Sequence, residues 1–175
     1  HYDTARRMLG VAINPRLWPA DEKCREIAEE LGRGNSFEPL PVGVFFGEED
    51  KTVPDPYFGG EGPARTGCNF CGGCMVGCRY NAKNTLVKNY LYFAEKLGAE
   101  LISEVKARDI RPLSAGQADG ARYEVLYSSS TAWFFRPQSR VRARNVIVSA
   151  GTIGTLELLF RCRDVTGSLK KISAH

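Results

Sequence analysis

Apolar residues recur at helical spacing in three parts of the chain, and each part is followed directly by a glycine. The first covers residues 2–9, the second covers about residues 20–31 and begins after Pro19, and the third covers residues 82–97. A proline at the start and a glycine just past the end are typical of helix boundaries. The pattern therefore predicts three helices, and it predicts the third most clearly because its apolar face is the most regular.

Extended segments are predicted between and after these helices. Residues 37–46 are apolar but interrupted by prolines, which favours an edge or irregular strand, and residues 48–67 have the composition of a loop. Residues 99–110, 122–127 and 131–141 are separated by turn-forming residues. These three segments predict a β-meander.

The last apolar stretch predicts a different kind of strand. Residues 145–150 form a nearly continuous apolar run, typical of a strand buried on both faces of a parallel sheet. Residues 151–155 contain two glycines and lead into an apolar helix, a turn that could present backbone N–H groups to a phosphate. A strand, a glycine turn and a helix in this order indicate an α/β fold.

Composition limits the possible classes of protein. The chain has 175 residues, of which 43% are hydrophobic and 25% charged, so it is neither disordered nor fibrous and has room for one domain or part of a larger one. No apolar run reaches the roughly 20 residues of a membrane span. The net charge of +4 is mild and does not indicate a nucleic-acid partner.

The histidines limit the chemistry further. The two histidines are the terminal residues, His1 and His175, so no Ser-His-Asp triad can be assembled. Because the sequence starts without Met and ends without a recognisable stop, we expect an internal fragment of a longer protein.

Four of the six cysteines, Cys68, Cys71, Cys74 and Cys78, fall within eleven positions. Their spacing is that of the bacterial ferredoxin run, which wraps an iron–sulfur cluster, although Arg79 stands where that run has proline. A zinc site, disulfides in an oxidising compartment and simply reduced thiols are further interpretations. The residues alone leave these alternatives open.

Three segments of the chain resemble the GMC (glucose–methanol–choline) family of flavin oxidoreductases, particularly its cholesterol oxidase-like bacterial branch, and they follow one another in the order found in that family. The strongest likeness is in residues 67–97, which read Gly-Cys-x2-Cys-Gly-Gly-Cys-Met-Val-Gly-Cys-Arg-Tyr-Asn-Ala-Lys-Asn-Thr-Leu and continue into the predicted helix. Residues 2–11 contain Ala-Arg-Arg-Met-Leu-Gly-Val, and residues 145–162 contain Val-Ile-Val-Ser-Ala-Gly-Thr-Ile-Gly-Thr. The likeness spans nearly the whole chain.

The resemblance implies the central part of a Rossmann-like FAD-binding domain. It implies FAD as cofactor, a small-molecule alcohol, sterol-like or otherwise bulky, as hydride donor, and a separate electron acceptor. It also implies that the backbone of Val105 reads the adenine of FAD, and that Ala150 and Gly151 pack beside the cofactor. Family members do not generally hold a metal at the clustered cysteines, so an iron–sulfur electron-transfer module, or a flavoenzyme with a 4Fe-4S cluster, is the alternative.

Two elements of the family pattern are missing from the sequence. A Gly-x-Gly-x-x-Gly turn after a first strand is absent, and no residue matches the catalytic His of the family, so no catalytic residue is assigned. We expect residues 1–67 to belong to the substrate or cap region, residues 68–98 to form a Cys-rich loop and helix, and residues 99–175 to supply the meander and the strand-turn-helix. Reduced cysteines favour a cytoplasmic protein.

Overall fold

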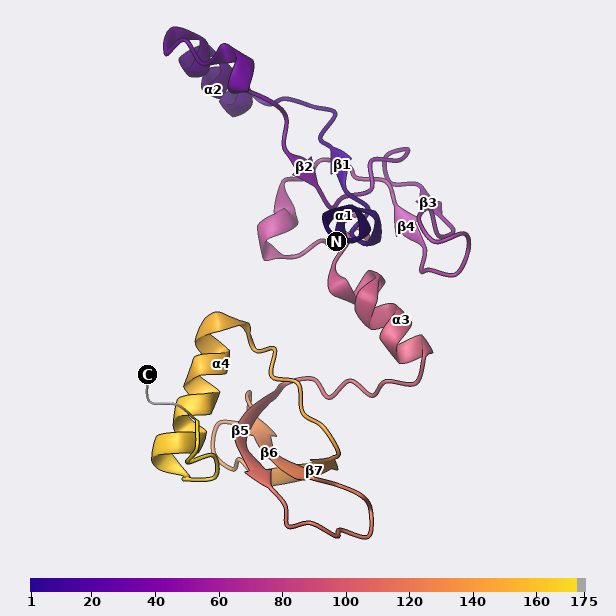
Figure 1. Cartoon of the computed structure of the whole chain (residues 1–175). Helices are drawn as coiled ribbons and strands as arrows, with labels where there is room; N and C mark the ends of the chain where they lie inside the picture. The colour runs from indigo at the N-terminus through magenta and orange to yellow at the C-terminus, as the bar shows by residue number, and fades with distance from the viewer. Residues whose placement is uncertain (173–175) are drawn as a thin grey trace. The chain divides into compact units, whose positions relative to one another are not determined.

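The computed structural model describes residues 1–172 and divides the chain into two compact units, His1–Glu100 and Leu101–His175. Figure 1 shows the helices and strands of both units in chain order. His175, one of the two histidines, lies outside the described residues.

The first unit consists of short elements joined by long loops. Its strands form two antiparallel pairs of two residues each, β1 with β2 and β3 with β4. The helices are α1 (Tyr2–Met8), α2 (Pro19–Glu30) and α3 (Tyr90–Lys96), and the strands are β1 (Ala12–Ile13), β2 (Pro41–Val42), β3 (Thr52–Val53) and β4 (Arg65–Thr66). Three 3₁₀ turns cover Gly34–Ser36, Gly73–Val76 and Leu86–Lys88.

The first two predicted helices are confirmed, and their boundaries have local causes. Gly10 follows α1 with φ 53°, and Gly32 follows α2 with φ 68°, a left-handed conformation that glycine adopts without steric cost. At the start of α2 the backbone N–H of Trp18 donates to the Asp21 carboxylate at 2.8 Å. Pro19 therefore starts a helix whose N-terminus is capped by the side chain of Asp21.

The third predicted helix is wrong for residues 82–89, because α3 begins only at Tyr90. The backbone of the preceding segment pairs with another part of the chain instead. The N–H of Phe45 donates to the carbonyl of Ala82 at 2.9 Å, and the N–H of Asn84 donates to the carbonyl of Gly43 at 2.8 Å. The first bond uses the Ala82 carbonyl, which a helix starting here would need, and together the two bonds hold this segment beside residues 43–45, so tertiary pairing overrides the helical pattern.

Arg65 lies at the centre of the first unit and is 0% exposed. Its Nε donates to Asn84 Oδ1 at 2.6 Å, and its Nη atoms donate to the carbonyl oxygens of Pro63 at 2.7 Å and Lys88 at 2.8 Å. One guanidinium thus joins the strand β4 to the segment before α3. Its planar set of donors suits this role.

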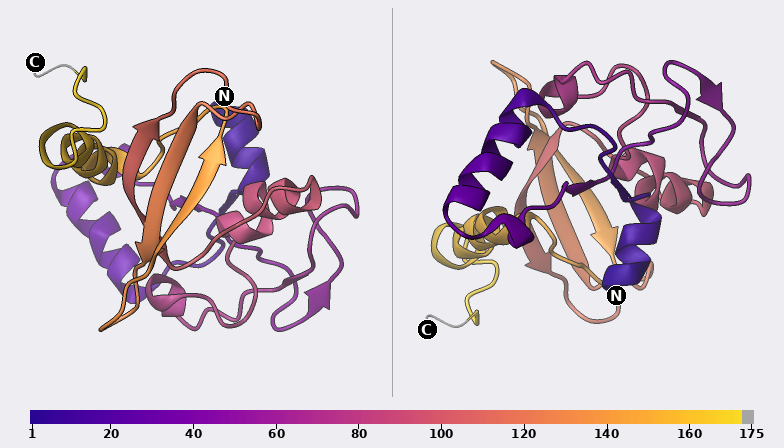
Figure 2. Two further views of the ribbon diagram at one scale, coloured as in Figure 1. Left: turned by 90° about the horizontal axis from the view of Figure 1, so that it is seen from below. Right: turned by 90° about the horizontal axis from the view of Figure 1, so that it is seen from above.

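The second unit contains the most regular structure. The strands β5 (Val105–Pro112), β6 (Tyr123–Ser129) and β7 (Gln138–Ala143) form one antiparallel sheet in the order β5-β6-β7, which confirms the predicted meander. The helix α4 (Gly151–Phe160) continues into a π-helical turn, Arg161–Val165. Figure 2 shows α4 on the β5 side of the sheet, away from β7.

The predicted buried strand at residues 145–150 is not formed. The segment has no regular secondary structure, pairs with no other strand within residues 1–172, and exposes Ile147 to 90%. A strand is stabilised by hydrogen bonds to neighbours on its edges, so an apolar run without neighbours remains open. All named strand pairs are antiparallel, so the Rossmann-like parallel sheet is absent from the described part of the chain. Among residues 1–172, every helix is too short or too polar to cross a bilayer.

Candidate functional site

A cavity of about 310 Å³ lies in the second unit, where β5 faces α4. It contains residues that the sequence analysis singled out and residues that it did not. The cavity is lined by Val105, Lys106, Ala107, Arg108, Ala150, Gly154, Glu157, Leu158 and Arg161. The structure thus brings together Val105 and Ala150, which are 45 positions apart in the sequence.

The backbone of Val105 points out of the sheet. Val105 lies opposite Ser129, and next to this pair the N–H of Ser130 donates to the carbonyl of Glu104 at 2.8 Å. In an antiparallel ladder this arrangement makes Val105 and Ser129 a non-hydrogen-bonded pair, whose own N–H and C=O groups face away from each other. Since β5 is an edge strand, the N–H and C=O of Val105 are directed to the free edge of the sheet.

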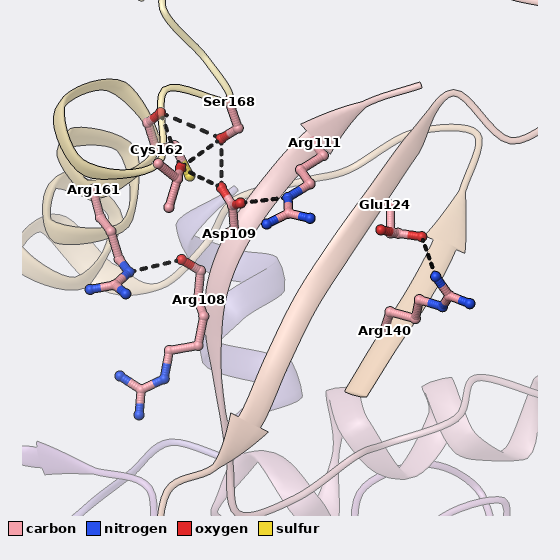
Figure 3. Close-up of polar contacts among 9 residues, drawn as sticks. Arg108, Asp109, Arg111, Glu124, Arg140, Arg161, Cys162 and Ser168 are labelled. Carbon is pink, nitrogen blue, oxygen red and sulfur yellow. Dashed lines mark hydrogen bonds and ion pairs between the residues drawn. The ribbon is translucent and has the colours of Figure 1, made fainter. Parts of the chain in front are cut away.

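A β-bulge limits how much of this edge is open. The register shifts between Ala107 and Asp109, so Arg108 is an extra residue in β5. The carbonyl of Arg108 accepts a hydrogen bond from Arg161 Nε at 3.1 Å (Figure 3). Arg161, which directly follows α4, thus covers the free edge of β5 at Arg108, while residues 105–107 border the cavity.

Ala150 and Gly151 lie at the N-terminus of α4. Ala150 is the N-cap, and its backbone N–H donates to Thr155 Oγ1 at 3.1 Å. Gly151 has φ 71°, in the left-handed region that favours glycine. Ala150 borders the cavity beside β5, whereas Gly151 lines a separate shallow depression with Ser149, Thr152, Thr155 and Leu156.

Charged side chains surround the mouth of the β5 cavity, and sequence reasoning missed them. Lys106 Nζ lies 2.7 Å from Glu157 Oε1, and this contact lowers the pKa of Glu157. Arg108 and Arg161 add two further cations. Isolated charges on exposed positions carry no sequence signal, so only the fold shows that these side chains meet at one place.

A second cavity, of about 450 Å³, lies in the first unit and is lined by Cys68, Cys71, Cys74 and Cys78. All four thiols are free. The Phe46 and Phe70 rings, stacked at 5.6 Å, also line it, so its wall is mainly apolar.

The electrostatics of the cysteines differ from one another. Burial raises the pKa of Cys68, whereas for Cys78 the backbone N–H groups of Lys83 and neighbouring residues outweigh the effect of burial and lower the pKa. Within residues 1–172 no group of three or more His, Cys, Asp or Glu side chains is arranged to hold a metal ion. The iron–sulfur alternative therefore gains no support from the geometry.

The second unit is thus a fold of mixed helix and sheet, with an antiparallel meander, an open edge strand, a flanking helix and a cavity between them. Comparison with known proteins identifies its family. The sequence pattern of the GMC oxidoreductase family matches residues 64–162, which include β5, the meander and all of α4. The chain belongs to the GMC oxidoreductase family.

Individual relatives agree with this assignment. The chain is 52% identical over 178 aligned positions to a protein named cholesterol oxidase from Acinetobacter baumannii, covering 99% of this chain and 32% of the relative. It is 48% identical over 169 positions to a cholesterol oxidase from Mycobacterium tuberculosis (strain CDC 1551 / Oshkosh), covering 94% of this chain and 28% of the relative. The chain thus spans about a third of the length of these relatives. No solved structure matches it.

Proposed function

We propose that this chain is part of an FAD-dependent oxidoreductase that oxidises the CH–OH group of an alcohol, with sterol-like alcohols as the preferred donors. Membership of the GMC family supports the flavin-linked oxidation, and the names of the relatives support the donor. Because the relatives are about three times as long, we assign the activity to a polypeptide that also contains counterparts of their other residues.

The edge of β5 is the observation that carries this proposal. One edge of adenine has an amino donor beside a ring-nitrogen acceptor, and an outward-facing backbone N–H and C=O on one residue match that pair. Val105 directs both groups to the free edge, next to the cavity of about 310 Å³. The residues present therefore fit the adenine end of FAD.

The N-terminus of α4 fits the diphosphate of the same cofactor. Helix N-termini present unpaired backbone N–H groups and a partial positive charge, both of which favour phosphate. Ala150 and Gly151 begin this helix, and Lys106, Arg108 and Arg161 line the neighbouring cavity. We assign the two N-terminal residues to the cofactor's diphosphate side and Val105 to its adenine side.

In the proposed reaction, FAD held by Val105, Ala150 and Gly151 would supply the hydride acceptor for the alcohol carbon and the route for electrons to oxygen or another acceptor. The described residues would bind and orient the cofactor: the β5 edge fixes the adenine, and α4 keeps water from one side of the cavity. No residue of this chain is assigned to removing the hydroxyl proton. We place the reaction in the cytoplasm, in keeping with free cysteines.

The test is to purify the complete polypeptide and record its visible absorption spectrum before and after denaturation. Two flavin bands, with FAD released on denaturation, together with oxidation of a sterol alcohol to its ketone, are expected. A colourless protein that takes up no added FAD contradicts the proposal.

Replacing Val105 by tryptophan tests the position of the cofactor site. Val105 lines the cavity and is 37% exposed, so a larger side chain would fill the space assigned to adenine. Val105→Trp is expected to weaken FAD binding at least about 100-fold, measured by the flavin fluorescence released on dilution. The control is Val141→Trp on β7, where the valine is 44% exposed and borders no part of the cavity. Equal loss of FAD in both variants would show that the cavity is not the site.

A further inference from the structure

Asp109 is a buried carboxylate on β5 that borders no part of the proposed cofactor cavity, and it is 2% exposed. Its Oδ1 accepts hydrogen bonds from the hydroxyls of Ser168 at 2.5 Å and Thr166 at 2.8 Å. Its Oδ2 accepts one from Arg111 Nε at 2.8 Å. Figure 3 shows the carboxylate between the strand and the turn that follows α4.

The two hydroxyl donors belong to the segment that ends the helix. Thr166 directly follows the π-helical turn, and Thr166 and Ser168 flank Gly167, which has φ 66°. Both hydroxyls also lie 3.4 Å from the carbonyl oxygen of Cys162, a residue that is 0% exposed. One carboxylate on the sheet therefore binds the turn that closes the helix.

A second contact holds the C-terminal end of α4 at Arg108, the residue before Asp109 on β5. Arg161 donates to the carbonyl of Arg108, the bulge residue. Because the bulge inserts one residue, Asp109 follows directly after the point where the helix end contacts the strand edge. Carboxylate and carbonyl together hold the C-terminal end of α4 on β5.

A ten-residue helix transmits this anchoring to its other end. The helix α4 spans Gly151–Phe160, about 15 Å of rigid rise, and Ala150 at its N-cap faces the same cavity as Val105. If the contacts at the C-terminal end of α4 were lost, a small rotation of the helix about that end would displace Ala150, at the other end, by a larger distance.

We propose that Asp109 is a positioning residue for the cofactor cavity: by binding Thr166 and Ser168 it fixes α4 against β5 and sets the spacing between Ala150 and Val105. This inference rests on the proposed function, since it concerns how FAD is held. Asp109 itself does not line the cavity and acts only through the helix.

The test compares two buried carboxylates of the same sheet in the complete polypeptide. Asp109→Asn removes the charge and leaves a single acceptor oxygen, which cannot accept from both Arg111 and the two hydroxyls, so the anchor is weakened. The control is Glu124→Gln on β6: Glu124 is 8% exposed and pairs with Arg140 at 3.7 Å on β7, not with the helix (Figure 3). We expect Asp109→Asn to raise the dissociation constant of FAD about tenfold or more, at a temperature where both variants are folded. Glu124→Gln should lower the melting temperature and leave FAD affinity unchanged.

Two further measurements separate positioning from a general loss of stability. Hydrogen exchange of the α4 amides, without FAD, should accelerate in Asp109→Asn and not in Glu124→Gln. Ser168→Ala removes one hydroxyl only, and it should weaken FAD binding in the same direction but less. The effects of Ser168→Ala and Asp109→Asn should not add, because both break one junction.

Each outcome decides between the two proposals. A wild-type polypeptide that binds no FAD contradicts the proposed function. If the wild type binds FAD and Asp109→Asn binds it with unchanged affinity, the positioning role is overturned. If Asp109→Asn does not fold, Ser168→Ala decides: unchanged FAD affinity in that variant overturns the role, and weakened affinity supports it.

Discussion

The two units bury opposite charges and stabilise them in different ways. Arg65 in the first unit is 0% exposed and donates to carbonyl and amide oxygens, all neutral. Asp109 in the second unit is 2% exposed and accepts from Arg111 and from two hydroxyls. The first arrangement joins loops around a cation, whereas the second fastens a helix to a regular sheet.

The difference has a consequence for how each unit responds to pH. Burial lowers the pKa of Arg65, but an arginine remains protonated across the usual range of pH. Burial opposes the ionisation of Asp109, yet hydrogen bonds from Ser168, Arg111 and Thr166 outweigh it and lower its pKa to about 2. We therefore expect acid to weaken the second unit through Asp109, while the contacts of Arg65 persist.

The largest effect on the free energy of unfolding is expected from replacing Arg65, the buried cation of the first unit. Arg65→Met keeps an unbranched apolar stem but leaves the acceptors Asn84 Oδ1 and the Pro63 and Lys88 carbonyls without their donor. Buried acceptors without partners cost about 1–3 kcal/mol each, so the free energy of unfolding should fall by more than about 3 kcal/mol. Urea denaturation measures this. Arg7→Met, at an exposed position of α1, is the control and should change little.

Acid titration should separate the two units next. A group whose pKa is lower in the folded state stabilises the fold above its unfolded pKa and loses that contribution as the pH falls. For Asp109 the pKa falls from 3.8 to about 2. The contribution is therefore about 2 kcal/mol above pH ~5 and disappears towards pH ~2. The difference in unfolding free energy between wild type and Asp109→Asn should shrink over this range. A constant difference would show that Asp109 is not the titrating group.

Local sequence signals were sufficient where an element depends on its own residues. Pro19 and Gly32 mark α2, and Gly10 marks the end of α1, because proline and glycine act on the backbone within one turn. The meander also followed from short apolar segments separated by turns. In each of these cases the hydrogen-bond partners lie nearby in the sequence.

The sequence failed where the partners are distant or absent. Residues 82–89 have a helical pattern, yet their backbone pairs with residues 43–45, and Asn84 serves Arg65. Residues 145–150 have the composition of a buried strand, but the described chain provides no neighbouring strand. Neither outcome can be read from periodicity, which reports the apolar face of a segment and not the partner of its backbone.

The candidate site was predictable only in part. Resemblance to a family pointed to Val105 and Ala150, and the structure places both on one cavity. Asp109 was missed, because a single charge in a strand pattern normally marks a solvent-facing position. Only the bulge at Arg108 and the turn after α4 show that this carboxylate is buried.

The smallest effect on stability is expected at the exposed pair Lys106–Glu157. This pair contrasts with Asp109, the buried carboxylate on the same strand as Lys106. Its side chains are 48% and 58% exposed, so Glu157→Gln should leave the melting temperature unchanged. Because both residues line the cavity, the change removes an anion and frees Lys106 for the diphosphate. FAD affinity should then rise about two- to fourfold at low salt and return to the wild-type value at high salt, where exposed charges are screened. Glu61→Gln removes a comparable exposed partner of Lys96 in the first unit and should leave FAD affinity unchanged. A rise that persists at high salt would show that Glu157 acts by shape rather than by charge.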